Sequence, residues 1–144
     1  CPVYEERMAD NPHYGPIDAV FVPLRSQFRT LDAFASVLAH EMTHSTGKEL
    51  GRDLTGGKGT PKYAKEELVA ELGSMFLCAA LGFDFHHKVE REENSAAYIA
   101  SWLKRTGNKD KELDIYKAAQ KALKASKLLK ERYDAMAETG KAAA

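Results

Sequence analysis

The sequence predicts an α+β fold that is mostly α-helical, with about four helices and a small β-sheet. Four segments combine helical apolar spacing or helix-favouring composition with capping residues or glycines at their ends. One short run of β-branched and aromatic residues is bounded by prolines, as expected of a strand. With 144 residues, of which 44% are apolar and 29% charged, the chain has the size and composition of one globular domain. We therefore expect residues 1–144 to form a single domain.

The strand is expected at residues 19–22, which read Ala-Val-Phe-Val and are followed by Pro23. The flanking prolines predict that it lies at a sheet edge, where an extended peptide substrate could add as a further strand. Residues 1–18 are rich in Pro, Asp, Asn and Tyr and are expected to be irregular. Because one strand is not a sheet, either further strands lie in residues 1–18 or the rest of the sheet lies upstream of Cys1.

The helices are predicted from their boundaries. Thr30 or Asp32 can cap the first helix, and the pair Thr60-Pro61 begins the second, which Gly82 ends. The stretch 47–60 between these two helices is expected to be a loop, and its glycines lack the spacing of a phosphate-binding loop. The four helices are expected at residues 31–46, 61–81, 95–103 and 111–136.

The first helix carries the sequence His40-Glu41-Met42-Thr43-His44, a His-Glu-x-x-His motif. Positions i and i+4 lie one turn apart on the same face of a helix, so His40 and His44 can bind one metal ion. Glu41 can act as general base toward a water molecule at that ion. The motif alone is also compatible with two histidines on a solvated surface.

The second helix adds two carboxylates at the same spacing, Glu67 and Glu71, among apolar residues. Buried carboxylates are unfavourable unless a cation or a hydrogen-bond donor compensates them. A zinc site with two histidines needs a third ligand and groups that orient the imidazoles. Glu67 as ligand with Glu71 as partner of a histidine meets both needs, and the reverse assignment stays open. Glu66 is expected on a solvated acidic face with nearby lysines.

Stabilising the oxyanion of a peptidase intermediate requires a further polar group. Tyr63, one turn before Glu67, is the candidate that we place among the catalytic residues. The other polar candidates are more readily explained without a catalytic role: Tyr98 as a core tyrosine, His86 and His87 as loop histidines. Trp102 and Cys78 are likewise expected to be core residues.

Several of these segments together resemble a known family. Residues 40–47 (His-Glu-Met-Thr-His-Ser-Thr-Gly) and 63–73 (Tyr-Ala-Lys-Glu-Glu-Leu-Val-Ala-Glu-Leu-Gly) resemble the zincin-like metallopeptidase domain of ArdC-type antirestriction proteins, which also occurs in TraC plasmid primases. The resemblance continues at residues 18–23, 76–82 and 97–104. It implies a zincin-like fold with a gluzincin-like site; the small sheet is truncated only if its other strands lie upstream of Cys1. In that site Zn²⁺ is bound by His40, His44 and Glu67, Glu41 is the base, and Glu71 orients a histidine.

We therefore expect a zinc-dependent metallopeptidase that hydrolyses peptide bonds in the antirestriction context of a mobile element or phage. Its partner is a peptide or protein substrate. DNA would be bound only through an upstream domain that the resemblance implies and that these 144 residues lack. The alternatives are a metal-stabilised antirestriction module without peptidase activity, favoured by a fourth ligand such as His86, and a helical interaction domain without metal.

Charge and composition set the remaining expectations. The net charge is zero, with 21 basic and 21 acidic residues, and the excess of lysines after residue 103 is interpreted as a solvated helix face. No apolar run approaches the ~20 residues of a membrane span, so no membrane partner is expected. Two cysteines and the lack of a visible signal peptide predict a cytoplasmic location.

Overall fold

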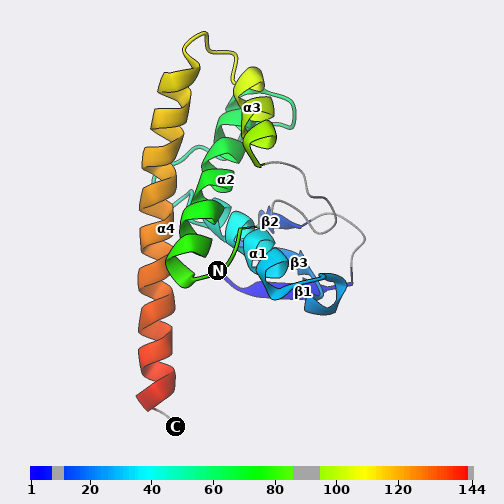
Figure 1. Ribbon diagram of the computed structural model, residues 1–144, viewed down its shortest axis with the longest axis vertical. Helices are drawn as coiled ribbons and strands as arrows, with labels where there is room; N and C mark the ends of the chain where they lie inside the picture. The colour runs from blue at the N-terminus through cyan, green and yellow to red at the C-terminus, as the bar shows by residue number, and fades with distance from the viewer. Residues whose placement is uncertain (8–11, 86–94, 143–144) are drawn as a thin grey trace.

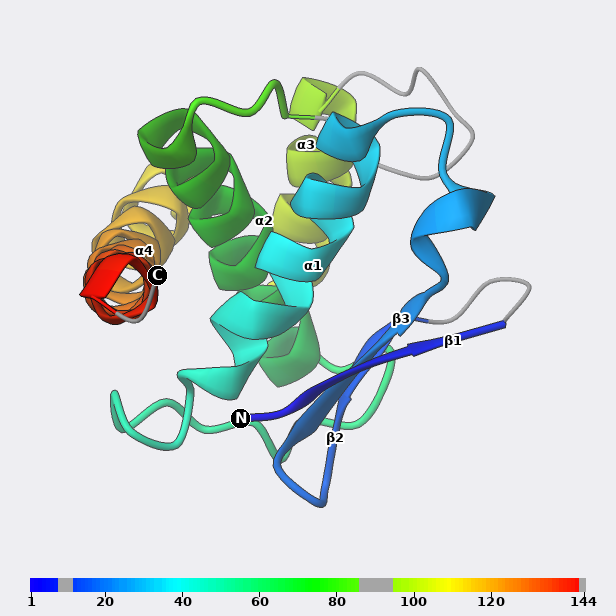
Figure 2. The ribbon, with the colours of Figure 1, turned by 90° about the horizontal axis from the view of Figure 1, so that it is seen from below.

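The computed structural model describes residues 1–7, 12–85 and 95–142. Within these ranges a small sheet lies on one side of a helical assembly (Figure 1). Seen from below, α1 lies between the sheet and α2, and α4 lies on the far side of α2 (Figure 2). The elements, in chain order, are β1 (Val3–Glu6), β2 (His13–Gly15), β3 (Ala19–Pro23), a short 3₁₀ turn (Arg25–Gln27), α1 (Leu31–Ser45), α2 (Pro61–Leu81), α3 (Ser95–Arg105) and α4 (Lys111–Ala142).

The sheet has three strands in the order β1-β3-β2, with β1 parallel and β2 antiparallel to β3. The prediction that residues 19–22 form an edge strand is therefore wrong, because β3 is paired on both sides. Val20 faces Val3 on one neighbour and Tyr14 on the other. Pro23 is the last residue of the strand, so its missing N–H ends the strand without freeing either edge.

Two of the three strands lie in residues 1–18, so the first of the two places expected for further strands is confirmed. Residues 1–18 are not wholly irregular, because they contain β1 and β2. All four residues of β1 are exposed, so it lacks the apolar alternation by which strands are recognised in a sequence. Its position is fixed by backbone pairing with β3, which a sequence pattern does not reveal.

The helix boundaries largely confirm the predicted ones. The Thr30 hydroxyl accepts a hydrogen bond from the N–H of Ala33 and caps α1, and Thr60 caps α2 in the same way. Gly82 ends α2 in the left-handed conformation, with φ of 78°. The fourth helix is longer than expected: α4 runs to Ala142, and its C-terminal part projects beyond the other elements (Figure 1).

The two central helices cross at very close range. A Cβ atom added to Gly73 of α2 would lie 2.6 Å from Cγ2 of Thr43 on α1, so only glycine fits there. Close by, the hydroxyl of Ser74 donates to the backbone carbonyl of Ser36 over 2.7 Å. Small residues thus bring α1 and α2 together, and this contact sets the distance between the side chains that the two helices present to each other.

The core that supports this pair is built around α2, which contacts α1, α3 and α4. Trp102 and Cys78 are both buried, as expected of core residues. Across the described ranges, none of the helices is both long enough and apolar enough to span a bilayer.

Candidate metal centre

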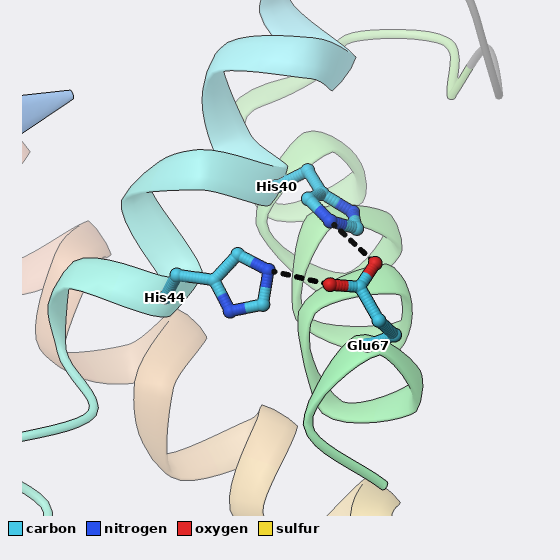
Figure 3. Close-up of side chains that lie close together, drawn as sticks. All are labelled: His40, His44 and Glu67. Carbon is cyan, nitrogen blue, oxygen red and sulfur yellow. Dashed lines mark ion pairs between the residues drawn. The ribbon is translucent and has the colours of Figure 1, made fainter. Parts of the chain in front are cut away.

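His40 and His44 lie one turn apart on α1 and face Glu67 of α2 (Figure 3). The His40 Nε2 atom is 3.6 Å from one carboxylate oxygen of Glu67, and the His44 Nε2 atom is 3.5 Å from the other. One donor atom from each residue lies within 4.8 Å of the others. The three side chains are only 10–17% exposed, so the cluster is largely shielded from water.

Each imidazole is held from behind by a second carboxylate. The Nδ1 atom of His40 lies 3.3 Å from Glu71, and that of His44 lies 3.1 Å from Glu66. A carboxylate at Nδ1 favours the proton on that nitrogen, so Nε2, on the side of Glu67, is the ring atom that could bind a metal ion. Glu67 rather than Glu71 therefore lies between the two Nε2 atoms. This geometry favours the first of the two assignments that the sequence left open.

The interpretation of Glu66 as part of a solvated acidic face is wrong. Its side chain is 12% exposed and forms an ion pair with the buried Arg52, in addition to the contact with His44. The loop between α1 and α2 folds back over this part of α2 and covers the carboxylate. The contact between the two residues was missed because nothing in the spacing links an arginine in a glycine-rich loop to one glutamate of a helix.

The three donors facing one another fit a divalent metal ion. Donors 2.0–2.2 Å from an ion at tetrahedral angles are roughly 3.3–3.6 Å apart. The two nitrogen–oxygen distances here are 3.5 and 3.6 Å and end on different oxygens of Glu67. One donor atom from each residue lies within 4.8 Å of the others, so an ion would draw the three donors closer together. Two imidazoles and a carboxylate suit Zn²⁺ and also Mn²⁺. The pair of rear carboxylates supplies the outer partners that such ligands usually have.

Without a metal ion, protons hold the cluster together. Burial by itself would lower the pKa of His40, but hydrogen bonds to Glu67 and Glu71 and the negative charges nearby raise it to about 10. The pKa of His44 is raised in the same way, through Glu66 and Glu67. Burial of Glu67 opposes its ionisation, yet the two histidines outweigh this and lower the pKa of its carboxyl group. A metal ion would take the place of these protons.

The proposed base Glu41 is buried beside this cluster, with 6% of its surface exposed. Its charge raises the pKa of His40 and that of Tyr63, so it lies within electrostatic range of both. Glu41 is not among the three residues whose donor atoms converge. Its role as a general base stays a prediction.

Tyr63 lies in the first turn of α2 and is close to Glu67. Burial, the charge of Glu67 and a hydrogen bond with it raise the pKa of the phenol. Tyr98, expected in the core, does pack edge-to-face on Trp102, with ring centroids 5.7 Å apart. Burial raises the pKa of Tyr98 to about 12, and the charges of Glu67 and Glu71 also raise it. His86 and His87 lie outside the described residues.

The chain is similar in sequence and in fold to known proteins. Residues 6–121 match the family model MPTase-PolyVal, described as a zincin-like metallopeptidase. The chain is 37% identical over 118 residues to the DNA primase TraC of Escherichia coli, covering 80% of the chain and 8% of that protein. It is 39% identical over 113 residues to the uncharacterized protein y4eC of Sinorhizobium fredii (strain NBRC 101917 / NGR234), covering 76% of the chain and 35% of that protein.

Two solved structures that match are of the antirestriction protein ArdC from plasmid R388. The Mn(II)-bound ArdC structure has a TM-score of 0.68 and 35% sequence identity, and the alignment covers 90% of this chain and 47% of ArdC. The metal-free ArdC structure gives 0.64 and 34%, covering 90% and 45%. The chain thus spans less than half the length of each of these relatives. The match confirms the zincin-like fold expected from the sequence.

Proposed function

The chain belongs to the zincin-like metallopeptidase family MPTase-PolyVal, and from this premise we propose that it is a metal-dependent peptidase with His40, His44 and Glu67 as metal ligands. One observation carries the proposal: two Nε2 atoms and the two oxygens of one carboxylate face one another at 3.5 and 3.6 Å. Glu71 orients His40 from the other side of its ring. We propose Zn²⁺ as the ion, and Mn²⁺ is the second ion to test because the similar ArdC structure is Mn(II)-bound.

When bound, a divalent ion supplies Lewis acidity toward the scissile carbonyl and the attacking water. The remaining work falls to side chains of this chain. Glu41 takes the proton of the attacking water on its carboxylate and later delivers it to the nitrogen of the leaving amine. Tyr63 keeps its proton at neutral pH, as any phenol does whose pKa is not lowered, and can donate a hydrogen bond to the oxyanion.

The substrate class that fits this chemistry is a peptide or protein, and the biological context that we propose is antirestriction on a mobile element or phage. The relatives support the context: one is an antirestriction protein from a plasmid and another is a DNA primase. We propose that DNA enters only through a domain outside these 144 residues. A second candidate follows from the same relatives, namely a metal-stabilised antirestriction module without peptidase activity.

The test is hydrolysis by the metal-loaded protein. The wild type, loaded with Zn²⁺ or Mn²⁺, is incubated with casein and with a mixture of unstructured peptides, and cleavage is followed by mass spectrometry. We expect cleavage by the wild type and none by Glu41→Gln, although the variant keeps its metal. If the loaded wild type cleaves nothing while it holds one metal ion per chain, the peptidase proposal fails and the binding module is favoured.

A further inference from the structure

We propose that Arg52 is a positioning residue for the metal centre: it fixes the carboxylate of Glu66, which in turn holds the His44 ring with Nε2 turned toward Glu67. This inference rests on the proposed function, since it explains how one ligand of that site is oriented. Arg52 comes from the loop between α1 and α2. Its side-chain hydrogen bonds in the described part of the chain go to Thr43, Thr46 and Glu66 and to none of the three ligands.

The guanidinium group of Arg52 is almost completely enclosed, with 3% of the side chain exposed. Its Nη2 atom donates to the backbone carbonyl of Thr43 over 2.6 Å, and Nη1 donates to the Thr46 hydroxyl over 2.9 Å. Its Nε and Nη2 atoms donate to the two carboxylate oxygens of Glu66 over 3.0–3.2 Å. The arginine therefore joins the C-terminal turn of α1 to α2.

The hydrogen bonds of Arg52 to Thr43 and Thr46 act on the end of α1, the helix that carries the histidines. The Thr43 carbonyl in the last turn of α1 also accepts from the Thr46 hydroxyl over 2.7 Å, and a cation near the C-terminal carbonyls of a helix is favourable. Arg52 supplies that cation to the turn of α1 that contains His44. The backbone N–H of Arg52 donates to the carbonyl of Gly47 over 2.7 Å, which folds the loop back onto the end of the helix.

The other hydrogen bonds of Arg52 act on the carboxylate of Glu66. Its Oε1 atom contacts both Nη2 of Arg52, at 3.0 Å, and Nδ1 of His44, at 3.1 Å. The two-point contact with the guanidinium fixes the plane of the carboxylate, and this plane sets the direction of the contact with the imidazole. His40 is held by Glu71 instead, at 3.3 Å, and therefore serves as an internal reference within the same site.

Arginine suits this position better than lysine. Its planar, permanently charged group can donate to both oxygens of a carboxylate and to a carbonyl at once, whereas the ammonium of lysine is a point charge. Loss of an outer partner of a metal-binding histidine typically weakens metal binding by about 10–100-fold. We expect a loss in this range when Arg52 no longer orients Glu66.

A positioning role must be separated from a purely structural one. Replacing a buried ion pair by apolar residues of similar volume is often neutral for stability, whereas removing one partner leaves a buried charge. The double variant Arg52→Met/Glu66→Leu should therefore fold about as well as the wild type but lack the group that orients His44. The single variant Arg52→Met tests the arginine alone.

The matched control is Lys62→Met. Lys62 on α2 pairs with Asp53 of the same loop and donates to Thr55 over 2.7 Å, so it also ties the loop to α2. It has no contact with a histidine among those that the structure describes. If Arg52 acts only by holding the loop, this control should weaken metal binding to a similar degree.

The experiment measures the zinc dissociation constant by competition with a chromophoric chelator, together with the Nδ1–H resonances of both histidines in zinc-loaded, ¹⁵N-labelled protein. We expect both Arg52 variants to bind zinc about 10–100-fold more weakly, and only the His44 resonance to move or disappear. Lys62→Met should match the wild type. If the double variant binds zinc with wild-type affinity and its His44 resonance does not move, the inference about Arg52 is overturned, while the proposed function is unaffected. If the wild type binds no zinc, the proposed function fails and the inference with it.

Discussion

The close crossing of α1 and α2 can be tested by substituting the glycine that permits it. In Gly73→Ala, the new Cβ would lie 2.6 Å from Cγ2 and 2.8 Å from Oγ1 of Thr43. Carbon atoms in contact are normally about 3.5–4.0 Å apart, so something must move by about 1 Å. Thr43 cannot easily turn away, because its hydroxyl donates to the carbonyl of Ala39 over 2.8 Å. The two helices must therefore separate beside His44.

The free energy of this change follows from two opposing effects. Overpacking costs about 1–3 kcal/mol, and alanine is about 1 kcal/mol more favourable than glycine within a helix. We expect a net loss of about 1 kcal/mol, which lowers Tm by roughly 3 °C in a domain of this size. In a Thr43→Ala background the clash with Cγ2 and Oγ1 disappears, and the closest remaining atom is Cβ of residue 43, at 3.2 Å. A shift of a few tenths of an ångström relieves that contact, so Gly73→Ala should then be stabilising by up to about 1 kcal/mol.

The assay is a double-mutant cycle from urea denaturation of metal-free protein. The coupling free energy between the two positions should be about 2 kcal/mol, large for a pair of small residues. If Gly73→Ala changes the free energy of unfolding by the same amount in both backgrounds, the close contact is refuted, and with it the helix spacing on which the metal centre depends.

Further predictions concern protons, the oxyanion and the metal. The pKa of His40 is about 10 in the folded protein against an ordinary 6.5, so protonated His40 should stabilise the metal-free fold below pH 6.5 and lose that effect as the pH rises to 10. Urea denaturation at several pH values in the presence of chelator checks this, and a free energy of unfolding that does not change with pH contradicts it. Tyr63→Phe should reduce kcat by about 10²–10³-fold with metal content unchanged, as steady-state kinetics would show; full activity would remove the tyrosine from the mechanism. Chelation should lower Tm by about 10 °C, reversibly on adding zinc, if the free ion is at about 1,000 times its Kd; an unchanged Tm would mean that no metal stabilises the fold.

The helices could be predicted from the sequence because their ends are encoded locally. Thr30 and Thr60 cap α1 and α2, and Gly82 ends α2 in a conformation that glycine adopts easily. The sheet was harder, because β1 is exposed along its whole length and is held only by pairing with β3. Pairing between distant segments leaves no periodic trace, so the central position of β3 could not be read from its flanking prolines.

The part of the site that could be predicted from the sequence is the two pairs of side chains with which α1 and α2 face each other. The i, i+4 spacing of His40 with His44 and of Glu67 with Glu71 sets one face on each helix, and the structure brings these faces together. What spacing could not supply was the environment of Glu66, next to Glu67 on the same helix. Its burial depends on where the loop between α1 and α2 folds, and that is decided by tertiary contacts of Arg52 rather than by any local pattern.

The central claim is that a single metal ion is bound between α1 and α2 by two histidines and Glu67. The most direct measurement is the metal content of wild type, Glu67→Ala and Glu71→Ala, purified in metal-free buffers and then loaded with zinc. We expect about one zinc per chain in the wild type, none in Glu67→Ala, and weaker but stoichiometric binding in Glu71→Ala. No zinc in the wild type, or zinc kept by Glu67→Ala and lost by Glu71→Ala, would contradict the account.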